Sequence, residues 1–116
     1  MDVTREEIAA RLGDAGLTLL DVRTPMEYRG EAGYPDPRQG HIPGARNVEL
    51  SELLGRSPEQ VRELVGLPEG AEIVTYCHSG ARSALAAQLL AAAGYRARNY
   101  EGSWAEWSRD PTLPAE

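Results

Sequence analysis

The chain has 116 residues, so it is about the size of one domain built on a single hydrophobic core. Its net charge is -6 at pH 7 and its pI is near 4.9, and a surface of that charge repels nucleic acids and anionic lipids, so we expect neither a nucleic acid nor a membrane as a partner. The most apolar segment, residues 84–94, has about half of the ~20 residues that a membrane-spanning helix needs, and the acidic N-terminus does not resemble a signal peptide.

The first half of the chain predicts a helix, a buried strand and a second, short helix. Thr4 can cap a helix whose first turn holds two glutamates. The apolar run 17–22, LTLLDV, is typical of a buried strand, and Pro25 suits the first turn of a short helix over residues 25–30. Residues 30–44 contain four glycines and three prolines, which predicts a long loop of the kind that is usually functional or variable.

The second half of the chain alternates predicted strands with predicted helices. Ser57 and Gln60 form a capping box that starts a helix, and Gly66 ends it. Such alternation predicts a mostly parallel sheet covered on both faces, within one domain spanning residues 1–116. The other expected elements are an extended run at 45–50, a strand at 72–76, a helix at 82–94, a strand at 96–100, a short helix or turn at 102–110 and a loose tail at 110–116.

The only cysteine, Cys77, stands between a predicted strand and a predicted helix in the sequence YCHSGARS. Ligands of parallel sheets bind beyond the carboxyl ends of the strands. Gly80 permits a positive φ, so that successive N–H groups can point toward one centre, and Arg82 and the helix N-terminus add positive charge. Such surroundings lower the pKa of a thiol from ~8.5 to about 3.5–7.5 and make it a nucleophile. A lone cysteine is more often an apolar filler, but a filler does not require glycine and arginine at these spacings.

An unpaired thiol also bears on the compartment of the protein. One cysteine cannot form an internal disulfide, and a free thiol fits a reducing environment. We therefore expect a soluble cytoplasmic protein.

Four segments, in order along the chain, resemble the rhodanese family of sulfurtransferases. CHSGAR (77–82) resembles the family's Cys-x-x-Gly-x-Arg active-site loop. The other three are LLDVRTPMEYRGE (19–31), RQGHIPGARNV (38–48) and YEGSWAEW (100–107). The resemblance implies an α/β fold, the rhodanese-like three-layer sandwich, with a central, mostly parallel, five-stranded sheet and helices on both faces.

The resemblance also implies sulfur transfer through a persulfide on Cys77. The thiolate would attack the outer sulfur of a small anionic donor such as thiosulfate, and cyanide or a thiol would then accept the sulfur. A protein could also serve as donor or acceptor. No organic cofactor or metal is implied, and one cysteine beside one histidine lacks the three or four ligands of a zinc site. The implied substrate-binding residues are those of the loop: His78, Ser79, Gly80, Ala81, Arg82 and Ser83.

Individual residues of this loop have more than one expected role. Arg82 can attract an anion or brace the loop, and His78 can meet an anionic donor or remain an exposed loop residue. Ser79 and Ser83 can donate hydrogen bonds to bound sulfur or cap the helix.

Other residues of the four segments are expected to be structural. In the family, Asp21 and Arg23 mainly tie the sheet to neighbouring loops, and His41 is expected to be a hydrogen-bonded structural residue. Trp104 and Trp107 are expected in the core or the wall of a pocket.

The chain departs from the animal thiosulfate enzymes of the family in two places. Those enzymes carry two cations directly after the cysteine, where this chain has His78 and Ser79, and a substrate-positioning arginine where this chain has Glu27. We therefore expect a less cationic pocket than theirs.

Two alternative functions compete with sulfur transfer. Phosphatases and arsenate reductases of the same fold place five residues between cysteine and arginine, whereas four separate Cys77 from Arg82 here, so the ring of amides is too small for a tetrahedral oxyanion. The other alternative is a rhodanese-like persulfide carrier or regulatory binding module without significant turnover. Regulatory modules of this kind usually lack the cysteine that this chain keeps.

Overall fold

A computed structural model describes residues 3–116 of the chain and shows a parallel sheet of four strands. The strand order is β2-β1-β3-β4, and every neighbouring pair is parallel. In the central pair, Leu20 lies opposite Thr75 and Asp21 opposite Tyr76. The strands are β1 (Leu17–Asp21), β2 (Arg46–Asn47), β3 (Glu72–Tyr76) and β4 (Arg96–Asn99).

The sheet has one strand fewer than the five expected. Of residues 45–50, only two join the sheet as its edge strand β2, and Leu50 already begins a helix. On the opposite edge, the N–H of Val3 donates to the carbonyl of Asn99 at 3.0 Å, but residues 3–116 form no further strand beside β4.

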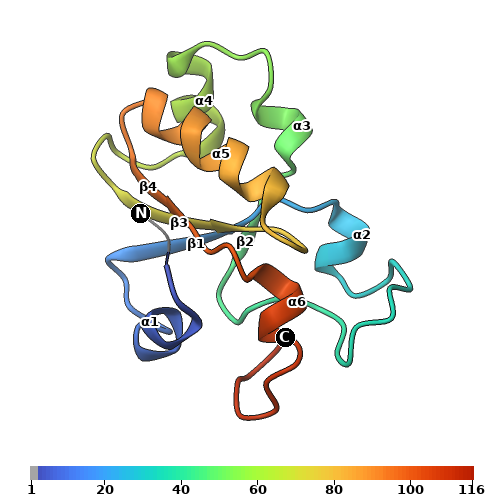
Figure 1. Ribbon diagram of the computed structural model, residues 1–116. Helices are drawn as coiled ribbons and strands as arrows, with labels where there is room; N and C mark the ends of the chain where they lie inside the picture. The colour runs from blue at the N-terminus through green and yellow to red at the C-terminus, as the bar shows by residue number, and fades with distance from the viewer. Residues whose placement is uncertain (1–2) are drawn as a thin grey trace.

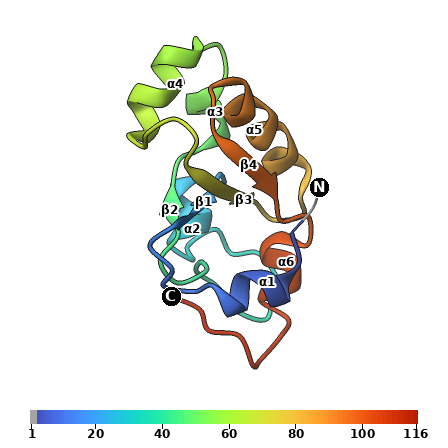
Figure 2. The same cartoon turned by 90° about the vertical axis from the view of Figure 1, so that its left-hand side faces the viewer.

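Helices cover both faces of the sheet, which confirms the expected three layers. Figure 1 shows α3, α4 and α5 on one face and α1 and α6 on the other, and Figure 2 shows the same arrangement after rotation. Figure 1 also shows α2 near the end of the sheet where β3 turns into α5. The helices are α1 (Arg5–Ala10), α2 (Pro25–Tyr28), α3 (Leu50–Leu53), α4 (Pro58–Val65), α5 (Ala81–Ala92) and α6 (Ser103–Trp107).

Local sequence signals explain where α4 begins and ends. The Ser57 hydroxyl accepts a hydrogen bond from the N–H of Gln60 at 3.2 Å, and the Gln60 side chain accepts one from the N–H of Ser57 at 2.9 Å. Gly66 ends the helix in the left-handed region at φ 75°. Helix α3 was not expected, although the N–H of Glu49 donates to the Glu52 carboxylate at 3.2 Å in a similar way.

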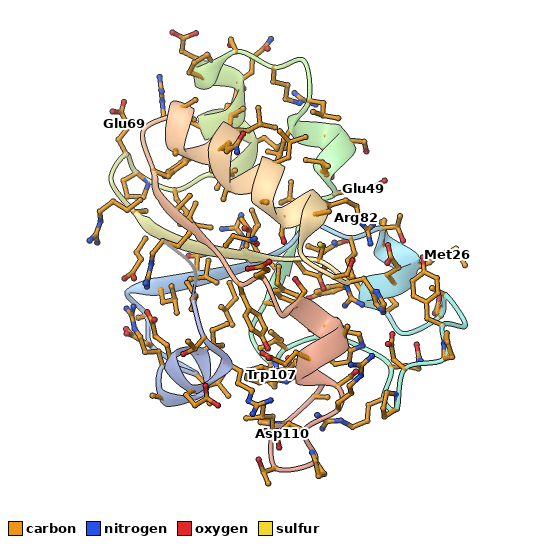
Figure 3. All side chains as sticks on the ribbon, in the orientation of Figure 1. Met26, Glu49, Glu69, Arg82, Trp107 and Asp110 are labelled. Atoms are coloured by element: carbon orange, nitrogen blue, oxygen red, sulfur yellow. The ribbon has the colours of Figure 1, made fainter. Side chains whose placement is uncertain are left out.

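Each face of the sheet carries its own hydrophobic core. Under α4 and α5, Leu20, Ile73 and Leu90 are fully buried. On the opposite face, Trp104 and Trp107 are 1% and 0% exposed, so both belong to the core, as Figure 3 illustrates for Trp107. The two layers therefore hold the sheet rigid between them, and the strand ends that carry the site are fixed by packing.

The C-terminal segment, expected to be a loose tail, makes several contacts in the structure. The indole N–H of Trp107 donates to the carbonyl of Pro114 at 2.7 Å. His41 and Glu116 exchange two backbone hydrogen bonds of 3.0 and 2.9 Å. Among residues 3–116, no helix is both long and apolar enough to cross a membrane.

Candidate active site

Cys77 lies directly after β3, where the chain turns into α5. The residue is 1% exposed, so its thiol lies beneath the loop formed by residues 78–80. The strand before it is buried between both helical layers, and α5 begins at Ala81, one or two residues earlier than expected. The thiol is thus held at the carboxyl end of a central strand, where parallel sheets place their ligands.

Hydrogen-bond donors surround the sulfur of Cys77, although hydrocarbon side chains pack beneath it. The N–H of Gly80 donates to Sγ at 3.1 Å. The hydroxyl of Ser83 lies 3.3 Å from Sγ and 3.2 Å from the carbonyl of Gly80, so its one proton can serve either acceptor. The hydroxyl of Ser103 lies 4.0 Å from Sγ and accepts a hydrogen bond from the N–H of Cys77 at 3.1 Å.

These donors favour the thiolate form of Cys77. Burial by itself raises the pKa of the thiol, but hydrogen bonds from the hydroxyl and N–H of Ser83 and from the N–H groups of Gly80 and Ser79 outweigh burial, and the pKa falls below its ordinary value. The donors stabilise the thiolate because they already point toward the sulfur, where its negative charge resides. The loop can therefore stabilise an anionic sulfur species.

Gly80 gives the loop its tight curvature. Its φ is 101°, in the left-handed region, and a Cβ built there would lie 2.5 Å from the carbonyl oxygen of Glu101. Only glycine fits both the dihedral angle and the space.

We expect Gly80→Ala to destabilise the protein and displace the loop N–H groups. The dihedral angle costs about 1–2 kcal/mol for a residue with a Cβ, and the backbone overlap adds about 1–3 kcal/mol. Gly55 is the matched control, because its φ is 75° but an added Cβ would meet nothing within 4 Å. Urea unfolding should show a larger loss for Gly80→Ala than for Gly55→Ala. Equal losses would show that the approach to Glu101 does not constrain the loop.

Arg82 braces the loop against α2. Its guanidinium makes two parallel hydrogen bonds of 2.9 Å to the buried carboxylate of Glu27. Figure 3 labels Arg82 at the start of α5. Thr24 completes the arrangement, because its N–H donates to the same carboxylate at 3.0 Å. The structure thus gives Arg82 the bracing role, with its positive charge matched by Glu27.

The Arg82–Glu27 pair should add to the free energy of unfolding at neutral pH, and acid should remove this contribution. Burial raises the pKa of Glu27, but the hydrogen bonds from Arg82 and Thr24 outweigh it and lower that pKa to about 2. A glutamate in the unfolded chain titrates near 4.5, so the pair's contribution to the free energy of unfolding is complete above pH 4.5 and disappears as the pH falls toward 2. Urea unfolding over this range should show a steeper loss for the wild type than for Glu27→Gln. If the free energies of unfolding of the wild type and of Glu27→Gln fell equally with pH, the Glu27 carboxylate would not be the cause of the acid sensitivity.

His78 and Ser79 border an open cavity of about 340 Å³ together with Arg82. Nε2 of His78 lies 3.0 Å from both carboxylate oxygens of Asp36, and the ring of Tyr34 lies against the imidazole at 5.4 Å between centroids. The loop expected at residues 30–44 therefore forms one wall of this cavity. Gly80, Ala81 and Ser83, which were also expected to bind substrate, do not line this cavity, and neither does the buried Cys77.

Asp21 and Arg23 form a buried pair behind the site. The Arg23 guanidinium donates to both oxygens of Asp21 at 2.7 to 3.1 Å and to the carbonyl of Gly40 at 2.7 Å. It also lies over the rings of Tyr76 and Trp104, 5.8 and 5.2 Å from their centroids. These contacts tie β1 to the loop before β2 and support the structural role expected for the pair.

His41 likewise makes structural contacts. Its Nδ1 lies 2.8 Å from the carbonyl of Tyr28, and the two rings stack at 3.7 Å. Within residues 3–116, no three histidine, cysteine, aspartate or glutamate side chains come together as a possible metal site.

Two residues near the site were not anticipated. Ser103, which bonds Cys77, adopts a φ of 54°, a conformation that residue type alone does not signal. Arg38 donates to four carbonyls at the end of α6 and beyond it, and the indole N–H of Trp104 donates to the carbonyl of Arg38 at 3.1 Å. The loop at 30–44 thereby fixes α6, and α6 places Ser103 beside Cys77.

The fold and the site define an α/β domain in which a loop of N–H and hydroxyl donors surrounds a cysteine sulfur at the end of a central strand. The chain belongs to the rhodanese-like domain family, whose profile matches residues 4–110. The resemblance seen in the four sequence segments is thus confirmed.

Similar proteins are named as sulfurtransferases. The thiosulfate sulfurtransferase of Azotobacter vinelandii is 38% identical over 97% of this chain and 45% of its own length. A probable 3-mercaptopyruvate sulfurtransferase of Pseudomonas aeruginosa is 40% identical over 92% of this chain and 41% of its own. A crystal structure of a probable thiosulfate sulfurtransferase superposes with a TM-score of 0.85 at 46% identity, covering 99% of this chain and 47% of that one. The chain therefore spans less than half the length of these relatives.

Proposed function

We propose that this protein transfers a sulfane sulfur from a small anionic donor, with thiosulfate as the leading candidate, to a thiophilic acceptor through a persulfide on Cys77. The observation that carries the proposal is the pair of donors on the sulfur, the Gly80 N–H at 3.1 Å and the Ser83 hydroxyl at 3.3 Å. These two donors lower the pKa of a buried thiol. A cysteine that only filled apolar space would not need donors directed at its sulfur.

The proposed reaction has two displacement steps. The Cys77 thiolate attacks the outer sulfur of thiosulfate, the S–S bond of the donor breaks, and sulfite leaves with the electron pair of that bond. The enzyme then carries Cys77–S–S⁻, whose charge the loop donors stabilise as they stabilise the thiolate. Cyanide or a thiolate attacks the terminal sulfur, and thiocyanate or a new persulfide leaves while the Cys77 thiolate is restored. Neither step requires an external oxidant or reductant.

Protein donors or acceptors are also compatible with this chemistry. A sulfur carrier protein of Thermus thermophilus, TtuD, is 37% identical over 97% of this chain and 45% of its own length. Because the persulfide is the same intermediate for a carrier and for an enzyme, both functions depend on the same loop. A free catalytic thiol also favours a reducing, cytoplasmic setting.

Mass spectrometry of the intact protein tests the proposal. Incubation with excess thiosulfate should add the mass of one sulfur atom and release one equivalent of sulfite. Subsequent cyanide should remove the added mass and yield thiocyanate. Absence of any adduct with thiosulfate, mercaptopyruvate or a protein persulfide would contradict the proposal. Loading without multiple turnovers in the presence of cyanide and thiols would favour the carrier over the enzyme.

A further inference from the structure

The positive charge of the loop arginine is already matched within the protein. Arg82 makes a two-point ion pair with Glu27, whose side chain is 2% exposed. The pair is neutral as a whole, although its cation is the more exposed partner, with the Arg82 side chain 37% exposed. A second cation on the cavity wall would match the remaining charge of a dianionic donor.

Arg109 meets this requirement. It follows α6 and borders the same cavity as His78, Ser79 and Arg82. It also borders a second cavity of about 670 Å³, which shares Ser79 with the first. Within residues 3–116, its guanidinium makes no ion pair, whereas the neighbouring Arg5 pairs with Glu6 at 2.9 Å.

We infer that Arg109 anchors the anionic group of the sulfur donor, such as the sulfonate end of thiosulfate, while Cys77 attacks the outer sulfur. This inference rests on the proposed function and names the residue that selects for anionic donors. Arginine suits the role, because its planar set of donors can bind two oxygens of one anion.

The other charged groups around the two cavities favour the side bordered by Arg82 for the anion. There, the only carboxylate among the lining residues is Asp36, and it is engaged by Nε2 of His78 at 3.0 Å. The larger cavity is lined by two carboxylates, Glu101 and Glu106, as well as by two arginines, Arg5 and Arg109. An anion is therefore expected between Arg109 and the loop, away from the glutamates.

Steady-state kinetics of Arg109→Gln test the inference. We expect the KM for thiosulfate to rise about tenfold, as for the loss of one charge-assisted hydrogen bond, with kcat at saturating donor little changed. The dependence of kcat/KM on ionic strength should also weaken. Arg109→Lys, which keeps the charge but not the planar donor set, should give an intermediate KM.

Arg56→Gln is the matched control, because it changes the net charge equally but lies at neither of the two cavities near the loop. It should leave the KM for thiosulfate unchanged. An unchanged KM in Arg109→Gln, or an equal rise in Arg56→Gln, would overturn the inference while wild-type persulfide formation still supported the proposed function. If the wild type itself formed no persulfide, the proposed function would fail first.

Discussion

Cys77→Ser is expected to reduce sulfur transfer from thiosulfate to cyanide to the uncatalysed rate. The substitution removes the only thiol of the chain, and a serine hydroxyl is not a nucleophile for sulfur at neutral pH without a strong base. The hydroxyl can still accept a hydrogen bond from the Gly80 N–H, so the loop should keep its shape. Thiocyanate formation measures the activity, and circular dichroism with urea unfolding measures the fold.

The comparison with Ser51→Ala makes this result specific to the site. Ser51 is an exposed serine of α3, and its substitution should leave both turnover and stability unchanged. Turnover by a folded Cys77→Ser protein well above the uncatalysed rate would show that another group carries the sulfur. A variant that lost activity only because it unfolded would be revealed by its circular dichroism spectrum.

Asp21→Asn is expected to cause the largest loss of stability among the substitutions considered. The side chains of Asp21 and Arg23 are 0% and 2% exposed, so the substitution leaves a buried guanidinium without its counter-charge. Removal of one partner from a buried pair typically costs about 3–5 kcal/mol. The free energy of unfolding in urea should fall by that amount.

Two comparisons separate the burial of this charge from the mere loss of an ion pair. Glu31→Gln breaks the exposed pair with Arg29 and should cost less than about 1 kcal/mol. The double variant Asp21→Asn/Arg23→Met removes both charges and should be more stable than Asp21→Asn alone. If the single variant lost no more than Glu31→Gln, the pair would not be the structural tie described above.

The parts of the site that could be predicted from sequence are those specified by neighbouring residues. Cys77, Gly80 and Ser83 lie within seven consecutive residues, so the turn and the first residues of α5 bring the N–H and hydroxyl donors to the sulfur. The ends of α4 were predicted correctly for the same reason, because a capping box and a terminal glycine act within a few residues. Local signals of this kind require no knowledge of the tertiary structure.

The parts that were missed depend on contacts between distant segments. Ser103 is separated from Cys77 by 26 positions and Glu27 from Arg82 by 55. No local sequence pattern predicts either contact. The expected fifth strand is absent from residues 3–116, and only the hydrogen bond from the N–H of Val3 to the carbonyl of Asn99 extends beyond β4. The contacts of residues 110–116 arise from Arg38 and His41 across the fold, whereas their sequence alone suggests a loose tail.

Every step of the proposed chemistry depends on a Cys77 sulfur that is anionic because the loop donates to it. Titration of the thiolate by its ultraviolet absorbance, with Cys77→Ser as the blank, measures this property directly. The wild-type thiol is predicted to ionise at lower pH than a free cysteine, and Ser83→Ala to ionise at higher pH than the wild type. A wild-type thiol that ionises at or above the free value would contradict this account.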